Sequence, residues 1–360
     1  MRRAIASFPP VLKSNPYQRL LYEHLAAHGF ELADGAQFEL GWLWRARREA
    51  GVLHFHWPQS FWHHERGPAV LRGPLSYVKV VLVAVRLAAA RALGYRVVWT
   101  IHQVYPHERS DPRLERLGAR ALATLSHILI AHDESTREHA VRELGPPARK
   151  TSIVPHGSYL GVYPPGRARA AVRKELDLGV DDLAFLCFGN LRAYKDVGFM
   201  LRAFGLADLR DAALIVAGSV TNDSVAADVR AAAAADTRVK PRLGFVPDDA
   251  VAELFGAADV AIVARNDGGT SGAVVLALSM GVPVVAPRRP AYAELLGADR
   301  AGWLYEPGDT ASLQAALEQA AAAGPAERAT RGEAAQRRAE ELAWPAIAAR
   351  TAALIRGERT

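Results

Sequence analysis

The stretch NDGGTSGAVVLALSMGVPVVAP, residues 266–287, predicts a turn, a helix and a strand in succession. Residues 272–280 are small or apolar and are numerous enough for two to three helical turns. Gly281 supplies the left-handed residue that ends such a helix, and residues 282–286 are typical of a short buried strand. Because the helix is apolar on nearly every side, we expect it to be buried against a sheet.

The start of this helix has a second property. Thr270 or Ser271 can cap it, and no bulky side chain occupies its first turn. The unpaired N–H groups near Ser271, Gly272 and Ala273, with the helix dipole behind them, would then form an anion site suited to a phosphate. The alternative is a well-capped core helix, and the stretch alone does not decide between the two.

Composition limits the class of protein. The chain has 360 residues, of which 50% are hydrophobic and 23% charged, which is enough for two packed domains. We find neither an uninterrupted apolar run of about 18 residues nor a secretory signal in MRRAIASFPP, and so expect no spanning helix. Cys187 is the only cysteine, which excludes an intramolecular disulfide and favours a cytoplasmic location.

Charge and aromatic residues are distributed unevenly. Residues 1–160 contain 21 Lys and Arg against 13 Asp and Glu, whereas the remainder contains 23 against 25. All 12 histidines and five of the seven tryptophans also precede residue 161. A basic, aromatic-rich half suits an anionic lipid surface, an acidic or phosphorylated acceptor, or a nucleic acid.

Apolar segments alternate with helical ones along the whole chain, which predicts parallel βαβ units. In such sheets ligands bind beyond the carboxyl ends of the strands. The expected strands of the first half are residues 3–8, 38–43, 52–57, 96–101, 127–131 and 151–154, and those of the second half are residues 183–188, 213–216, 239–243, 260–264 and 282–286.

Polar side chains follow the strands of the first half. They are His54, His56 and Trp57, the run HQVYPHE (residues 102–108), His132 to Glu134, and His156 with Gly157. His54 and His56 have a spacing that some metal sites use, but further ligands would be needed, and we expect no metal.

The second half places two cations on a glycine turn. Gly189 begins the turn GNLRAYK, which carries Arg192 and Lys195 three residues apart. This turn follows a strand, so both charges are expected at the edge where the helix at Gly272 begins. Cations beside a helix N-terminus are suited to a diphosphate, whereas solvated surface cations are the simpler alternative.

Two further turns lie where a nucleoside pocket is expected. Gly218 follows the strand expected at residues 213–216, and the backbone of Phe245 and Val246 in Gly-Phe-Val-Pro could read a base edge. An ordinary strand-to-helix turn would have the same sequence. Neither GxGxxG nor GxxxxGK[ST] occurs, so a redox or ATPase function is not supported.

Taken in order, FGNLRAYKDVGFMLRAF, LIVAGS, RLGFVPDDAVAELFGAADVAIV and GTSGAVVLALSMGVPVVAP resemble a nucleotide-sugar glycosyltransferase of the GT-B fold. HFHWP and WTIHQVYPHE extend the resemblance to the first half. The second half of the chain is similar to glycosyltransferase family 4 and to its relatives, the bacterial exopolysaccharide mannosyltransferases. The resemblance implies two Rossmann-like, doubly wound α/β domains facing a cleft, with Arg192 and Lys195 on the donor diphosphate.

The expected domains are residues 1–165 for the acceptor and 180–335 for the nucleotide sugar, with residues 344–360 as a helix crossing back to the first domain. Gly189, Thr270, Ser271 and Gly272 complete the predicted diphosphate site. Gly218, Phe245, Val246 and Asp267 are the candidates for the donor sugar or nucleoside.

The sequence departs from the family at one place. Family 4 enzymes usually carry two glutamates eight residues apart around the phosphate helix, one for the donor sugar and one for the ribose. The matching positions here are Gly268 and Leu276. Asp267 is the nearby carboxylate that could replace the first glutamate, whereas the ribose contact and the stereochemical outcome stay unassigned.

The candidate catalytic residues lie in the first half. The resemblance places His102 opposite the donor sugar, and His56, Asp133 and Glu108 are the further candidates, with a general base for the acceptor hydroxyl expected among residues such as His107, Glu108 and Asp133.

We therefore predict a metal-independent glycosyltransferase without a cofactor. It would move a sugar from a GDP- or UDP-sugar to a hydroxyl of a glycan, a lipid-linked glycan or a small molecule. The expected location is the cytoplasm, with peripheral association at the inner face of the plasma membrane and no nucleic acid as partner. The alternatives are a GT-B epimerase or phosphorylase, and a non-catalytic nucleotide-sugar or nucleic-acid binding protein.

Overall fold

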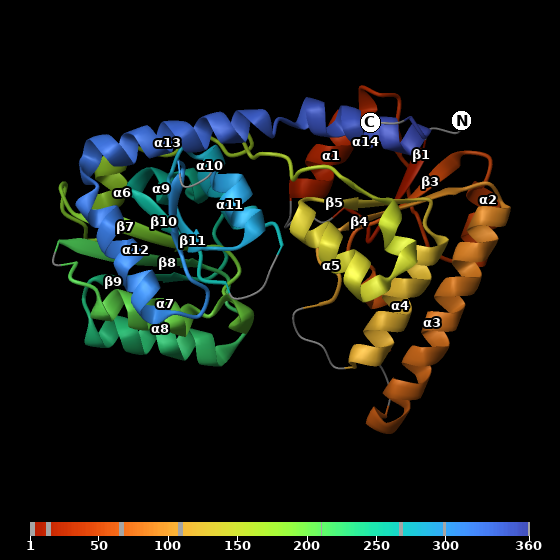
Figure 1. The fold of residues 1–360 in the computed structure, drawn as a ribbon, viewed down its shortest axis with the longest axis horizontal. Helices are drawn as coiled ribbons and strands as arrows, with labels where there is room; N and C mark the ends of the chain where they lie inside the picture. Colours follow the sequence, from red (N-terminus) through yellow and green to blue (C-terminus); the bar gives the residue numbers. More distant parts are fainter. Residues whose placement is uncertain are drawn as a thin grey trace. The chain divides into compact units, whose positions relative to one another are not determined.

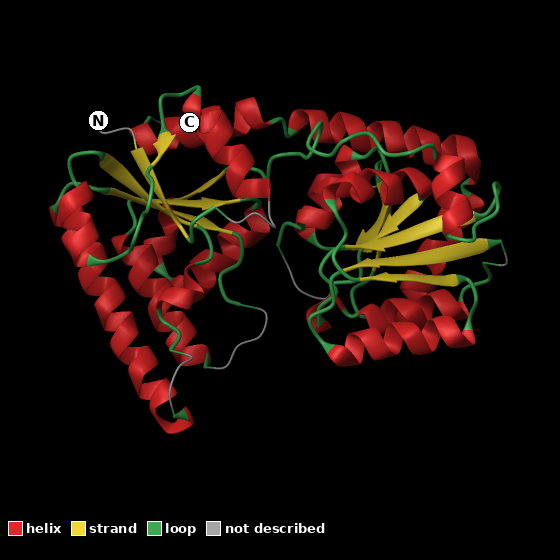
Figure 2. Ribbon diagram, turned by 180° about the vertical axis from the view of Figure 1, so that it is seen from behind, coloured by secondary structure: helices red, strands yellow, loops and turns green. Residues whose placement is uncertain are grey.

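The computed structural model describes residues 4–11, 16–64, 68–106, 111–209, 211–265, 269–297 and 300–358. The chain divides into two compact units. Unit 1 is Met1–Gly157 together with Trp344–Thr360, and unit 2 is Ser158–Ala343. Each unit is a parallel sheet with helices on both faces (Figure 1, Figure 2).

The sheet of unit 1 has the strand order β2-β1-β3-β4-β5-β6, and every pairing is parallel. Its central strands are apolar because both faces are covered. The strands are β1 (Ala4–Phe8), β2 (Glu31–Leu32), β3 (Ala50–Phe55), β4 (Arg96–Ile101), β5 (Ile128–Ala131) and β6 (Thr151–Ile153).

In unit 1, α1 and the last helix, α14, pack together on one face of the sheet, and α3, α4 and α5 cover the other (Figure 1). The helices are α1 (Pro16–Ala26), α2 (Leu40–Ala46), α3 (Ala69–Ala92), α4 (Pro112–Leu125), α5 (Glu134–Leu144) and α14 (Trp344–Arg356), with short 3-10 turns η1 (Pro58–Phe61) and η2 (Pro146–Lys150).

The sheet of unit 2 has the order β12-β11-β10-β7-β8-β9, again all parallel. Phe185 of β7 is fully buried at its centre. The strands are β7 (Leu183–Phe188), β8 (Ala212–Gly218), β9 (Val239–Leu243), β10 (Val260–Ile262), β11 (Val284–Pro287) and β12 (Gly302–Tyr305).

In unit 2, α7, α8 and α12 cover one face, and α6, α9, α10, α11 and α13 cover the other (Figure 1). The helices are α6 (Arg169–Glu175), α7 (Val197–Leu206), α8 (Asp223–Ala235), α9 (Asp248–Ala257), α10 (Gly272–Ser279), α11 (Pro290–Leu296), α12 (Thr310–Ala322) and α13 (Gly324–Glu341), with the 3-10 turn η3 (Ala193–Lys195).

The expected strand at residues 38–43 is wrong. The segment forms α2, in which Trp42 and Leu43 turn into the core while Trp44 is 58% exposed. The periodic aromatic residues imitate strand alternation, but the burial of two successive residues fits the helix. The chain also forms α6, which lies between the two expected domains, and β2, α11 and β12, none of which was predicted.

The order of strands in unit 2 creates a switch point between β7 and β10. From β7 the chain moves outward to β8 and β9, and then returns to build β10, β11 and β12 on the other side. The connections after β7 and β10 therefore diverge to opposite faces of the sheet. Open α/β sheets bind their ligands at the carboxyl edge of such a point.

Candidate functional site

The loop after β7 carries the predicted cations to this edge. Gly189 has φ +115°, a backbone conformation that favours glycine, and a Cβ there would lie 3.2 Å from the Lys195 Nζ atom. Arg192 is exposed, and Asp196 ends the turn by capping α7 at the Phe199 N–H. The loop is thus shaped by backbone geometry and a helix cap, which leaves the Arg192 guanidinium on the surface of the edge.

A close backbone approach joins the loops after β7 and β8. A Cβ at Gly218 would lie 1.9 Å from the Gly189 carbonyl oxygen, so only glycine fits at this position. The Leu191 N–H donates to the Ser219 carbonyl at 2.7 Å, and this bond continues the pairing beyond the strands. Gly218 therefore has a structural reason to be glycine, in addition to its predicted place beside the nucleoside.

The helix expected from the opening stretch is α10. Its core-facing residues are buried, whereas Gly272 and Ala273 in the first turn are partly exposed. Ser271 is the N-cap residue and is 2% exposed, but its side chain makes no capping hydrogen bond. The N-terminus of α10 thus has small residues and an open first turn, as a phosphate site requires.

Arg265, which the sequence analysis missed, connects these two segments. It follows β10, and its guanidinium carbon lies 5.2 Å from the centre of the Tyr194 ring, between Arg192 and Lys195 in the sequence. Arg265 is 9% exposed. Its signal in the sequence is an arginine directly after the apolar segment VAIVA, on the strand that neighbours β7. The structure therefore brings three cations and the start of α10 to the carboxyl ends of β7 and β10.

The structure describes some of the remaining candidates for binding the donor sugar or nucleoside. The Gly244 N–H donates to the Gly218 carbonyl at 2.9 Å, which holds the turn after β9 beside the turn after β8. Phe245 is 76% exposed in this turn and Val246 is partly exposed, so an aromatic face is available to a base. Asp267 lies outside the described residues. Leu276 is 5% exposed within α10 and offers no group to a ribose.

The histidines that follow the strands of unit 1 form one cluster. His56 Nδ1 lies 3.1 Å from His102 Nε2, and His102 Nδ1 lies 3.2 Å from His132 Nε2. Trp57 stacks on the His102 ring with centroids 4.3 Å apart. His102 is the partly exposed ring of the three, whereas His56 is 1% exposed and His132 6%.

Of the other catalytic candidates, the structure describes only Asp133. Asp133 is 3% exposed, and its carboxylate accepts from both the backbone and the hydroxyl of Thr136, at 2.7 and 3.0 Å. It therefore caps α5, a structural role that occupies both oxygens. Glu108 and His107 lie outside the described residues.

No group of three His, Cys, Asp or Glu side chains with the geometry to hold a metal occurs in the part of the chain that the structure describes. His54 and His56 are adjacent, with ring centroids 4.2 Å apart, but His54 Nε2 is paired with the Thr100 hydroxyl at 2.8 Å.

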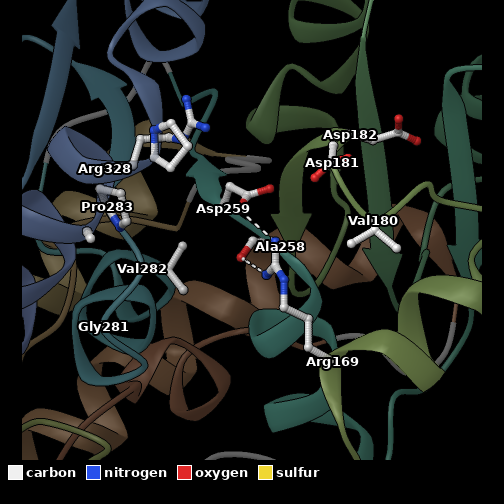
Figure 3. Close-up of a pocket in the computed structure, with 12 residues that line it drawn as sticks. Arg169, Val180, Asp181, Asp182, Ala258, Asp259, Gly281, Val282, Pro283 and Arg328 are labelled. Atoms are coloured by element: carbon white, nitrogen blue, oxygen red, sulfur yellow. Dashed lines mark hydrogen bonds and ion pairs between the residues drawn. The ribbon is translucent and has the colours of Figure 1, made fainter.

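A pocket of about 370 Å³ lies in unit 2 at the opposite, amino edge of the sheet (Figure 3). The arginine side chains that line it already make hydrogen bonds and ion pairs within the protein. Arg169 donates to the carbonyls of Gly256 and Ala258 and pairs with Asp259, and Arg328 donates to helix carbonyls. This pocket therefore lacks the donors that a diphosphate needs.

Two family models match the chain. "Glycosyl transferases group 1" matches residues 182–322, which contain the diphosphate candidates, and "Glycosyltransferase Family 4" matches residues 78–158. With two doubly wound parallel sheets and the cationic edge of unit 2, these matches define the class of the protein. It is a GT-B glycosyltransferase, an enzyme that moves a sugar from a nucleotide sugar to an acceptor.

The chain is 28% identical over 327 residues to the GDP-mannose:glycolipid 4-beta-D-mannosyltransferase of Xanthomonas campestris pv. campestris. The match covers 88% of this chain and 84% of that protein. A D-inositol 3-phosphate glycosyltransferase of Geodermatophilus obscurus is 28% identical over 220 residues, which are 58% of this chain and 49% of that protein.

Solved structures show the same fold. Sucrose-phosphate synthase of Thermosynechococcus elongatus aligns with a TM-score of 0.75 at 18% identity, covering 99% of both chains. Anabaena HepE in complex with UDP and glucose aligns with a TM-score of 0.74 at 15% identity, covering 99% of this chain and 100% of that one.

Removal of either loop cation is expected to weaken binding of the nucleoside diphosphate. A charge-assisted contact to phosphate contributes about 1.5–3 kcal/mol, so Arg192→Ala and Lys195→Ala should each lower the affinity roughly ten- to hundredfold. Isothermal titration calorimetry with the nucleoside diphosphate measures this affinity. Arg230→Ala, at an exposed position on α8, is the control. Wild-type affinity in both loop variants would show that the diphosphate binds elsewhere.

A side chain at the first residue of α10 is expected to block the phosphate. Gly272→Val places a branched side chain at the open first turn, and Gly272→Pro also removes an N–H donor. Both variants should retain their circular dichroism spectrum and lose turnover. Normal turnover of the donor by either variant would exclude this helix as the phosphate site.

Proposed function

We propose that the protein transfers mannose from GDP-mannose to a lipid-linked glycan and forms a β-linkage. The arrangement at the switch point of unit 2 carries the proposal, because it offers cations and a helix N-terminus to a diphosphate. The choice of GDP-mannose and of a glycolipid is supported by the Xanthomonas mannosyltransferase, which matches along most of both chains.

The absence of the two family 4 glutamates is consistent with a donor and an outcome that differ from the family pattern. Leu276, where family 4 enzymes place the ribose glutamate, is part of the buried core of unit 2. The donor would therefore be held by a different set of contacts from the one that the family pattern describes. A β-linked product from an α-linked nucleotide sugar also inverts the anomeric carbon, so the family's retaining outcome is not carried over.

We propose further that no metal or cofactor takes part. Departure of the nucleoside diphosphate requires that its negative charge be neutralised. Arg192, Lys195 and Arg265 supply positive charge at the edge where α10 presents its N–H groups. These groups can supply the positive charge that a divalent cation supplies in other transferases.

The function is tested by incubating the protein with GDP-mannose, GDP-glucose, UDP-glucose or UDP-galactose, with and without a polyprenyl-diphosphate-linked glycan. We expect GDP release from GDP-mannose alone among these donors, dependent on the acceptor and unchanged by EDTA. NMR of the product should show a β-mannoside. An epimerase would change the donor without acceptor, and turnover of a UDP-sugar in preference would refute the assignment of GDP-mannose.

A lipid-linked acceptor requires access to a membrane, and α3 offers a surface for it. The helix has 24 residues, and by length and composition it could cross a membrane, which the sequence analysis did not expect. Its inner face packs on unit 1 through Ser76, Val83, Leu87 and Ala90. Its outer face exposes Val70, Leu71, Leu75, Tyr77, Val78, Val81, Leu82 and Val85.

The basic residues of α3 contribute less to this surface than their sequence implies. Lys79 donates to the His63 carbonyl at 2.6 Å, Arg91 donates to the Leu125 carbonyl at 2.9 Å, and Arg86 lies over the Phe38 ring. We therefore propose that α3 lies on the membrane surface mainly through its apolar residues. The excess of Lys and Arg over Asp and Glu in residues 1–160 favours anionic lipid, at about 1 kcal/mol for each basic residue near the surface.

Charge on this outer face is expected to abolish membrane binding. Val78 and Val81 are 53% and 62% exposed, so glutamate at both positions should not disturb folding. We expect the double variant to stay at the bottom of a flotation gradient with anionic vesicles, whereas the wild type floats. Val180→Glu is the control, because Val180 is 83% exposed in unit 2. Equal flotation of wild type and double variant would rule out α3 as the contact.

A further inference from the structure

Three adjacent strands of unit 1, β3, β4 and β5, end beside one another, and each is followed by a buried or partly buried histidine at the carboxyl edge. The resulting contacts form one continuous chain. The Tyr22 hydroxyl lies 2.8 Å from His56 Nε2, and the chain continues through His102 to His132 at 3.1 and 3.2 Å. His132 Nδ1 lies 3.0 Å from the Val154 carbonyl oxygen. We call these five groups the histidine chain.

The carbonyl at one end determines every proton in the histidine chain. A carbonyl oxygen only accepts, so His132 carries its proton on Nδ1 and, as a neutral ring, accepts at Nε2. His102 must then donate from Nδ1 and accept at Nε2, and His56 must do the same. The Tyr22 hydroxyl completes the order by donating to His56 Nε2. The opposite order would require Val154 to donate.

Burial keeps these rings uncharged. Desolvation lowers the pKa of His56 and of His102 well below the usual value, and the neighbouring histidines lower it further. The pKa of His132 is also lowered by burial, although its bond to Val154 and the Asp133 carboxylate act in the opposite direction. Each ring is therefore neutral near pH 7, which is the state that the proton order requires.

His102 is the member of the chain that a substrate can reach, and both of its ring nitrogens are engaged by His56 and His132. It follows β4 at the carboxyl edge of unit 1, it is partly exposed, and Trp57 stacks on its ring. His56, on the other side, follows β3, which forms the switch point of this sheet with β1. A substrate that reaches this edge meets His102 and not the buried rings behind it.

We propose that His132, anchored on the Val154 carbonyl, is a positioning residue that fixes His102 as a neutral imidazole with its proton on Nδ1 for sugar transfer. The inference rests on the proposed function. Glycosyl transfer develops positive charge on the sugar ring, and an imidazolium beside it would oppose that charge. A neighbour that holds His102 uncharged and in one orientation therefore favours the reaction.

Two substitutions of His132 separate positioning from packing. In His132→Gln the amide oxygen can take the place of Nε2 and accept from His102 Nδ1–H, whereas His132→Leu fills similar space without an acceptor. We expect the Leu variant to lose about 10- to 100-fold in kcat with an unchanged KM for the donor, and the Gln variant to retain most of kcat. Equal kcat in the two variants would overturn the proposal.

Tyr22→Phe provides a second comparison from the other end of the chain. It removes the donor to His56 Nε2 but leaves the anchor at Val154, so His102 should keep its tautomer and the enzyme most of its kcat. A loss as large as in His132→Leu would show that the order is not determined from the Val154 end. His24→Gln is the control on the same helix, because His24 pairs with the Leu20 carbonyl outside the histidine chain.

Nitrogen NMR of the histidine side chains supplies a readout that does not depend on activity. We expect His102 to show protonated Nδ1 and unprotonated Nε2 in the wild type, in His132→Gln and in Tyr22→Phe, and a mixture of tautomers in His132→Leu. Thermal unfolding of each variant establishes that it is folded. If the wild type shows this tautomer but does not use GDP-mannose, the proposed donor fails and the kinetic test is made with the donor that is used. If the wild type shows the other tautomer, the inference fails.

Discussion

The parallel pairing of β7 with β10 is the constraint on which unit 2 depends. Val260 and Ala261 pair with Phe185 and Leu186, although some 70 residues of chain separate the strands. Because β8 and β9 lie on one side of this pair and β11 and β12 on the other, the loops that leave β7 and β10 cannot cover each other. This topology places the cations after β7 and β10 and the small residues at the start of α10 at the same edge of the sheet.

Contacts between the loops at this edge fix their conformation. Gly218 lets the loops after β7 and β8 touch, and the Gly244 N–H bonds to the same residue from the next turn. The ring of Tyr194 under the Arg265 guanidinium joins the loop after β7 to the segment after β10. The four connections after β7, β8, β9 and β10 are thus joined by contacts that leave the Arg192 side chain exposed.

Much of this fold could be predicted from the sequence, because buried parallel strands are continuous apolar runs and glycine marks their ends. The segment 183–188 is an example, since expectation and structure coincide at both ends. The failures have physical reasons. The edge strand β12, GWLY, is short and is separated from its neighbour by a helix that lacks a side-chain cap. In α2, closely spaced aromatic residues imitate the period of a strand.

The site was predictable to the extent that it depends on strand ends. Arg192, Lys195 and the start of α10 follow neighbouring strands, and their shared edge follows from topology. Arg265 was missed because one arginine after a strand has no distinctive pattern until Tyr194 is known to lie beside it. The histidine chain also required the structure: the sequence places a histidine after each of several strands, but only the register of β3, β4 and β5 brings the rings into contact.

The buried histidines also connect the stability of unit 1 to acidity. Burial lowers the pKa of His54 and of His156 to about 3, and it lowers the pKa of the three rings in the histidine chain. The unfolded chain binds protons at these residues as the pH falls below about 6.5, whereas the lowered pKa values delay this uptake in the folded unit. The stability of the folded state therefore falls with the pH, by at most about 1.4 kcal/mol per pH unit for each ring. Since all 12 histidines precede residue 161, the residues that take up these protons all lie in the first half of the enzyme. Through histidine, a mildly acidic compartment would loosen unit 1 and leave unit 2 unaffected.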